Sequence, residues 1–145
     1  MEILRHAHSG LRWLVLIFVL AAIINSLGKT KGSTPFTGKD KSLALIGLIV
    51  THLQLVIGLI LYFISPKVMF SGTAMKDPAL RFFLVEHSVM MLIAITLITI
   101  GYSRAKRLAD DGKKFKTILT FYALGLLLIL IAIPWPFRNL GGSWF

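Results

Sequence analysis

Cysteine is absent from the 145 residues of the chain. Its absence excludes disulfide bonds, thiolate metal sites, thiol redox catalysis and covalent haem attachment through a C-x-x-C-H motif. Acidic residues are scarce, with 6 Asp and Glu against 16 Lys and Arg, which gives a formal net charge of +10. The basic residues concentrate in short segments between apolar runs, a pattern typical of membrane topology rather than of nucleic-acid binding. We therefore expect no nucleic-acid partner.

Long apolar runs dominate the rest of the sequence. Hydrophobic residues make up 56% of the chain and the mean hydropathy is +0.79, far above that of an average soluble domain. The expected spans lie at about 9–27, 42–64, 80–103 and 117–134. Each approaches the roughly 20 residues that cross a bilayer, and each is apolar all round. The sequence predicts an all-α fold: residues 1–145 form one integral membrane domain, a four-helix up-down-up-down bundle in contact with lipid.

The orientation follows from the distribution of basic residues. Four spans place both termini and the connection at 65–80 on one side, and the other two loops on the opposite side. The side with the termini carries Arg5, Arg12, Lys67, Lys76, Arg81 and Arg138. The opposite side carries Lys29, Lys31, Lys39, Lys41, Arg104, Lys106, Arg107, Lys113, Lys114 and Lys116. The positive-inside rule makes this second side cytoplasmic. We expect a multi-pass protein of the bacterial inner membrane with periplasmic N and C termini.

Histidines are the candidate functional residues. His87 lies about two turns inside the third run, and His8 just precedes the first, while His52 is close to mid-membrane. An ionisable residue within a span is costly and is functional by default. In the predicted topology the first and third helices are diagonal neighbours that start from the same side. A planar cofactor between them would accept one imidazole from each helix.

Two imidazoles on opposite sides of an apolar slot are what non-covalent bis-histidine haem b requires. Arg5 and Arg12 share a helix face with His8, and Arg81 lies on the outer side of the third run. These arginines are candidate partners for the haem propionates, because a guanidinium binds a carboxylate in bidentate fashion. Gly58, in the second run, would let the macrocycle approach the backbone closely.

Three segments carry a resemblance to a known family. They are HSGLRWLVL from residue 8, HLQLVIGLILYF from residue 52 and EHSVMMLIAITLITIG from residue 86. Together they resemble one four-helix half of haem A synthase, and the chain also resembles small bacterial membrane proteins described as cytochrome B. The resemblance implies His8 and His87 as axial haem ligands. A single half lacks the second haem site of the synthase, so the resemblance implies haem binding without the synthase reaction.

Structural roles are the alternative for each histidine. His87 would fix helix packing by donating to a backbone carbonyl or to Glu86, and His8 would anchor a helix at the interface. His52 would join helices through hydrogen bonds, or line a quinone pocket. His6 is two residues from His8 and points to a different helix face, so we do not expect both to bind one iron.

Electron transfer is the expected function. A haem b cytochrome of this kind carries electrons between quinol and a partner on the outer face, and is not a stand-alone enzyme. Other respiratory subunits, or a second copy of the chain that shares the haem, are the expected protein partners. One alternative is copper or zinc handling through His6, His8 and His87. The other is a structural subunit of a larger membrane complex.

Overall fold

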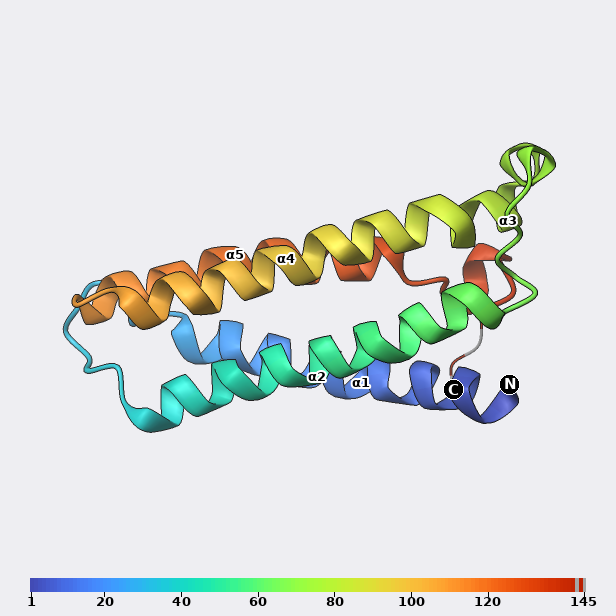
Figure 1. The fold of residues 1–145 in the computed structure, drawn as a ribbon. Coiled ribbons are helices and arrows are strands. Elements are labelled where there is room, and N and C mark those ends of the chain that lie inside the picture. The colour runs from blue at the N-terminus through green and yellow to red at the C-terminus, as the bar shows by residue number, and fades with distance from the viewer. Residues whose placement is uncertain (143, 145) are drawn as a thin grey trace.

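The computed structural model describes residues 1–142 and 144, and their regular structure is entirely helical (Figure 1). The long helices are α1 Glu2–Ser26, α2 Gly38–Ile64, α4 His87–Arg107 and α5 Asp111–Ala132. The short elements are η1 Gly72–Lys76, α3 Pro78–Arg81, the π-helical turn η2 Phe82–Glu86 and η3 Pro136–Arg138. The segments α3, η2 and α4 run on as one span of 30 residues. The prediction of an all-α fold is confirmed, and four helices are long and apolar enough to cross a membrane.

Several helix ends differ from the expected bounds, and α2 and the third span begin earlier because of caps. The second helix was expected from residue 42 but begins at Gly38, because Thr37 and Asp40 form a capping box. The third span begins two residues before the expected position 80, where the Asp77 side chain accepts hydrogen bonds from two backbone amides and proline occupies the first helical position. The last helix ends at Ala132, two residues before the expected position, close to the first proline of Pro134-Trp135-Pro136.

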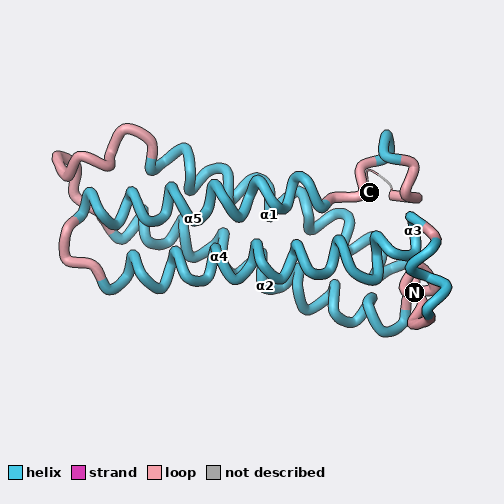
Figure 2. Tube along the Cα trace, turned by 90° about the horizontal axis from the view of Figure 1, so that it is seen from above, coloured by secondary structure: helices cyan, strands magenta, loops and turns pink. Residues whose placement is uncertain are grey.

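The helices pack in a closed square. The principal contacts join α1 to α2, α2 to α4, α4 to α5 and α5 to α1, so that α1 and α4 lie diagonally (Figure 2). Both chain termini and the connection from α2 to α3 lie at one end of the bundle, which we call the terminal end (Figure 1). The connections from α1 to α2 and from α4 to α5 lie at the opposite end.

The core is closely packed towards the opposite end. Ile98, Ile118 and Tyr122 are buried there, and the Tyr122 hydroxyl donates to the Ala44 carbonyl across the bundle at 2.7 Å. Glycine lets α4 and α5 approach, since a Cβ on Gly101 would lie 2.5 Å from a side-chain atom of α5. The terminal half lacks this close packing and contains the cavity described below.

The outer surface is apolar along much of the bundle. Ile17, Val56 and Leu127 are each more than half exposed, with exposed fractions of 57%, 55% and 53%. Soluble proteins rarely expose continuous apolar surface of this extent. At the terminal end, the rings of Trp13 and Trp144 stack with centroids 6.5 Å apart. Such a surface, with tryptophans at its edge, fits a lipid-facing bundle with an aromatic belt.

Candidate functional site

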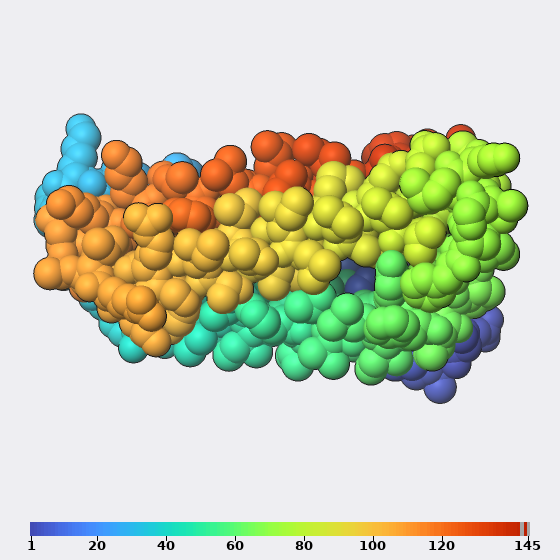
Figure 3. Space-filling view, turned by 45° about the horizontal axis from the view of Figure 1, so that its top comes forward, coloured from blue at the N-terminus to red at the C-terminus, as the bar shows by residue number. Residues whose placement is uncertain are grey.

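A cavity of about 630 Å³ occupies the terminal half of the bundle. Its size is within the range of roughly 300–1,000 Å³ that small-molecule sites have. Figure 3 shows a hollow between α2, in green, and α4, in yellow-green, with blue α1 visible behind it. Leu59, Val89 and Leu92 line the cavity yet are 44%, 48% and 47% exposed. The cavity is therefore open to the side, between two helices that face lipid if the bundle crosses a membrane.

Helical periodicity selects the residues that line the cavity. The lining residues of α2 include Thr51, Gln54, Leu55, Gly58 and Tyr62, which recur every three or four positions. This spacing places them on one face of the helix. Residues of α1, α4 and α5 complete the lining. All four long helices thus contribute to one space.

His8 of α1 and His87 of α4 both line this cavity. Their ring centroids are 6.4 Å apart and their planes make an angle of 71°. Two imidazoles that bind one metal ion from opposite sides would have centroids about 6.2–6.4 Å apart, given metal–nitrogen bonds of about 2.0–2.1 Å and a ring radius of about 1.1 Å. The structure therefore brings the two predicted ligands together, with their ring centroids at a distance that leaves room for one metal ion between them.

His87 is held by a helix end and follows the π-helical turn. Its backbone amide donates to the carbonyl of Phe82, and its ring Nδ1 lies 2.8 Å from the Ala132 carbonyl oxygen. A carbonyl oxygen only accepts, so Nδ1 carries the proton and Nε2 keeps its lone pair. Among the described residues, no hydrogen-bond partner is present for Nε2. A metal-binding histidine has this arrangement, with one ring nitrogen fixed by a carbonyl and the other available.

The Ala132 carbonyl that accepts from His87 lies at the end of α5, where other side chains also donate hydrogen bonds to backbone carbonyls. The last carbonyls of a helix have no partner within the helix. Here Trp135 donates to the carbonyl of residue 130, and Arg138 to those of residues 131 and 133. His87 serves the fourth of these carbonyls, at residue 132. The acceptor for His87 is thus part of a fully bonded helix end, which fixes the orientation of the ring.

His8 stands against α2 at a glycine. A Cβ on Gly58 would lie 3.1 Å from His8 Cε1, a tighter contact than nine in ten Cβ contacts in proteins. Gln54, one turn away, donates from Nε2 to the His8 carbonyl at 2.7 Å. Within the described part of the chain, His8 Nδ1 and Gln54 Oε1 are buried without a hydrogen-bond partner. Buried polar atoms rarely lack partners, so these two mark a place where a ligand or a small rearrangement supplies them.

Cations gather where the cavity meets the terminal end. Arg5, Arg12 and Lys67 line it, and none of the described residues that line it is acidic. The Arg12 guanidinium donates to the Trp144 carbonyl at 2.8 Å, and the Lys67 amine donates to the Gly141 carbonyl. Burial and the nearby Arg5 lower the pKa of Lys67. Three cations without a lining carboxylate form a site suited to an anionic group.

Arg81 lies outside the cavity lining. Its guanidinium Nε is 2.9 Å from Glu86 Oε1, and both side chains are about two-fifths exposed, at 41% and 40%. A π-helical turn separates the two residues, so a spacing of five positions brings them together. Of the two partners expected in the structural alternative for His87, the structure shows the backbone carbonyl, that of Ala132 in α5, and not Glu86.

His52 is also outside the cavity lining. It lies one position after Thr51 and is turned by about 100° from that residue, at the edge of the lining face of α2 and one turn deeper than Leu55. Its Nδ1 is 2.9 Å from the Leu48 carbonyl, and its Nε2 is 3.5 Å from Thr99 Oγ1 of α4. This geometry matches the predicted alternative in which His52 joins helices through hydrogen bonds.

His6 lines the cavity with His8 and His87. Among the described residues, however, no group of three or more His, Cys, Asp or Glu is placed to hold a metal ion. In the described structure, the three histidines of the copper or zinc alternative are thus not grouped around one position. Two histidines suffice only where the metal brings further ligands of its own, as the iron of haem does.

Comparisons with known proteins identify no relative: neither a family model, nor a curated protein, nor a solved structure matches the chain. The functional argument therefore depends on the geometry of the cavity.

Proposed function

We propose that the chain is a membrane cytochrome that binds haem b non-covalently, with His8 and His87 as axial ligands. It carries electrons between quinol and a partner on the outer face, and is not a stand-alone enzyme. The observation that carries the proposal is the pair of imidazoles that line one cavity, with ring centroids 6.4 Å apart. The resemblance of three sequence segments to one half of haem A synthase implies the same two ligands.

The other residues of the cavity fit the same group. The absence of a side chain at Gly58 leaves the space against α2 that the His8 ring occupies. Two of the three expected partners for the propionates, Arg5 and Arg12, line the cavity. The third, Arg81, is paired with Glu86 away from the cavity, and Lys67 takes its place in the proposed set. When bound, haem supplies the one-electron oxidation and reduction of its iron.

Three features of the protein would act on a bound haem: the strength of the histidine ligands, the apolar surroundings and the nearby positive charges. Donation from His87 Nδ1 to the Ala132 carbonyl makes the other ring nitrogen a stronger ligand. The largely apolar lining excludes water, and the three cations stabilise negative charge at the terminal end. These are the means by which a protein tunes the potential of a bound haem.

The opening between α2 and α4 supports quinol as the electron donor. Leu59, Val89 and Leu92 form an apolar rim there, and each is exposed on the outer surface. A quinol dissolved in the bilayer would reach the cavity by this route without crossing the membrane surface. The outer-face partner would exchange electrons at the terminal end, where the cations lie.

The proposed orientation in the bacterial inner membrane has an up-down-up-down topology with periplasmic termini. Because the chain has no cysteine, single cysteines report it directly. Gly72→Cys lies in the connection at the terminal end, with no atom within 4 Å of its new Cβ, and Lys113→Cys lies at the exposed start of α5. A membrane-impermeant maleimide should label Gly72→Cys in intact spheroplasts and Lys113→Cys only after lysis. The reverse pattern would contradict the orientation.

The functional proposal is tested with protein purified in detergent from cells supplied with haem precursor. We expect about one non-covalent haem b per chain by pyridine haemochrome assay, and reduction of that haem by a soluble quinol analogue. The matched variant Leu92→Trp, which narrows the lateral opening, should keep its haem and be reduced more slowly. A colourless wild-type protein would overturn the cytochrome assignment, and haem that quinol does not reduce would overturn the assignment of the donor.

A further inference from the structure

A second cavity, of about 240 Å³, lies at the opposite end of the bundle. Lys41 of α2, Lys106 of α4 and Lys114 of α5 line it, together with Tyr102. Lysines from three different helices thus surround one small space. We propose that this cavity binds the phosphate headgroup of an anionic phospholipid. The proposal does not depend on what the first cavity holds.

Charge is the first argument. None of the described residues that line the cavity is acidic. Lys114 pairs with Asp111 at 2.9 Å, which offsets one of the three positive charges. Within the described chain, Lys41 and Lys106 take part in no ion pair, so their two charges remain for a ligand.

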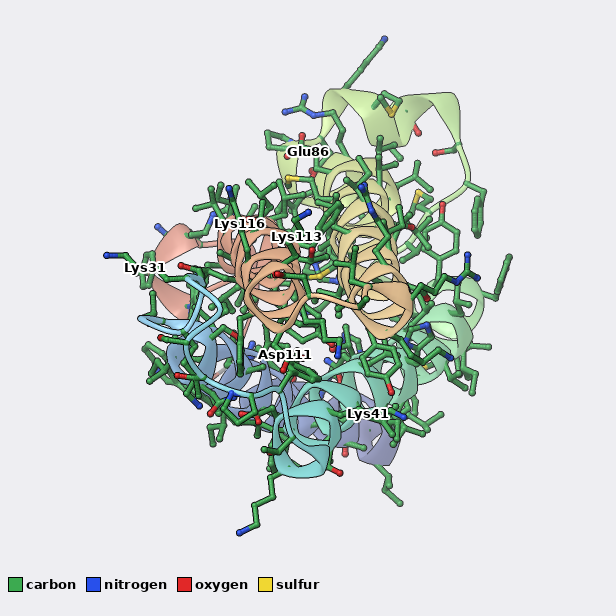
Figure 4. All side chains as sticks on the ribbon, turned by 90° about the vertical axis from the view of Figure 1, so that its left-hand side faces the viewer. Lys31, Lys41, Glu86, Asp111, Lys113 and Lys116 are labelled. Atoms are coloured by element: carbon green, nitrogen blue, oxygen red, sulfur yellow. The ribbon has the colours of Figure 1, made fainter. Side chains whose placement is uncertain are left out.

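Other carboxylates at this end have partners elsewhere. Asp40 accepts hydrogen bonds from Thr37 and from Lys29, whose amine is 3.3 Å away. The Asp110 side chain caps α5 by accepting from the backbone amide of Lys113. Figure 4, which views the bundle from this end, shows Lys31, Lys41, Lys113 and Lys116 spread around it. The whole end is cationic, but only one group of lysines surrounds a cavity.

The position of the cavity along the bundle and the apolar surface beside it favour a lipid as the source of the phosphate. The cavity lies where α2 and α5 begin and α4 ends, which is where headgroups meet a membrane-spanning bundle. Further along the same helices, Ile46 of α2 and Ile100 of α4 are 40% and 39% exposed, and they offer apolar surface to acyl chains. Basic pockets between spanning helices on the cytoplasmic side are a known form of anionic lipid site. The Tyr102 hydroxyl supplies a neutral donor beside the lysines.

The test measures lipid selectivity by native mass spectrometry of delipidated protein. Equal amounts of phosphatidylglycerol and phosphatidylcholine with the same acyl chains are added, and the ratio of the two bound lipids is recorded. We compare Lys41→Gln/Lys106→Gln with Lys31→Gln/Lys116→Gln, which removes the same charge from exposed lysines at this end that do not line the cavity. Each cavity lysine should contribute about 5-fold to the selectivity, so the first variant should lose about 25-fold and the control little.

Three results would overturn the assignment. They are equal binding of the two lipids by the wild type, equal loss of selectivity in the two double variants, and full displacement of phosphatidylglycerol by inorganic phosphate. The last would assign the cavity to soluble phosphate. Lys41 and Lys106 are exposed, so their replacement should leave the circular dichroism spectrum unchanged. Lys106→Gln alone, with an expected loss of about 5-fold, keeps the test decisive if the double variant folds poorly.

Discussion

Replacing His87 with alanine is expected to lower haem affinity by more than about 100-fold, so that the purified variant is nearly colourless. Loss of groups that merely support a metal ligand costs roughly 10–100-fold, and loss of the ligand itself should cost more. The change also removes the hydrogen bond from Nδ1 to the Ala132 carbonyl, which fixes the ring. Haem content after purification, followed by titration of the apoprotein with haem, gives the magnitude.

His52→Ala is the matched control, because His52 is a histidine of a neighbouring helix that does not line the cavity. It should retain the haem content of the wild type. Free imidazole added to His87→Ala should restore haem binding, since the space of the missing ring remains in a folded protein. A His87→Ala protein with full haem content would contradict the ligand assignment, and so would equal losses in the two alanine variants.

Gly58→Leu is expected to lower the haem content to less than about a tenth of that of the wild type. Even a Cβ at this position would lie 3.1 Å from His8 Cε1, and the rest of a leucine side chain would extend into the space of the ring or of the haem. Overpacking of this kind forces neighbouring side chains out of their preferred positions. Gly58→Ala should show a smaller loss, because His8 would have to move by only a few tenths of an ångström.

Thermal melting of the apoprotein distinguishes a loss of haem binding in the Gly58 variants from a loss of folding. Alanine and leucine favour a helix over glycine by roughly 0.5–1 kcal/mol, so neither change should weaken α2 itself. Thermal melting of the apoprotein should therefore be unchanged or slightly higher in both variants while haem titration shows the loss. A Gly58→Leu protein that binds haem as the wild type does would contradict the position proposed for the macrocycle.

The helical fold was predictable because each span combines length with apolar composition. The prediction of spans and of the diagonal pair needed only the apolar runs and the order of the helices, and the structure brings His8 and His87 together as that order implies. The predicted starts of two helices were less accurate. Both α2 and α5 begin with a polar turn, at Gly38 and Asp111, which a side-chain cap stabilises as helix. A search for apolar residues does not detect such a turn.

The details of the site were harder to predict because they depend on contacts between distant segments. The acceptor for His87 is a carbonyl 45 residues away, on the end of another helix, and nothing in the sequence around His87 indicates it. Lys67 lies in a connection, where no periodicity places its side chain, and it was not among the expected site residues. Arg81 was expected in the site, but the π-helical turn directs it to Glu86.

His52 shows how much helical periodicity alone can decide. Thr51, Gln54 and Gly58 follow one face of α2, and a residue directly after Thr51 is turned by about 100° from that face. This spacing separates His52 from Gln54 and Gly58, but Leu59, which lines the cavity seven positions after His52, shares its side of α2, so depth along the helix also decides. The unpartnered atoms of His8 and Gln54 have no such signal in the sequence, because burial without a partner arises only from the three-dimensional packing.

The most direct test of the central claim is the electron paramagnetic resonance spectrum of the oxidised wild-type protein, recorded with its absorption spectrum. Two imidazoles that bind one haem iron from opposite sides should give a low-spin ferric signal, with sharp haem b absorption bands on reduction. This result would support His8 and His87 as joint ligands, as the 6.4 Å spacing of their rings predicts. A high-spin signal would show that one of the two does not bind the iron, and a protein without haem would contradict the account altogether.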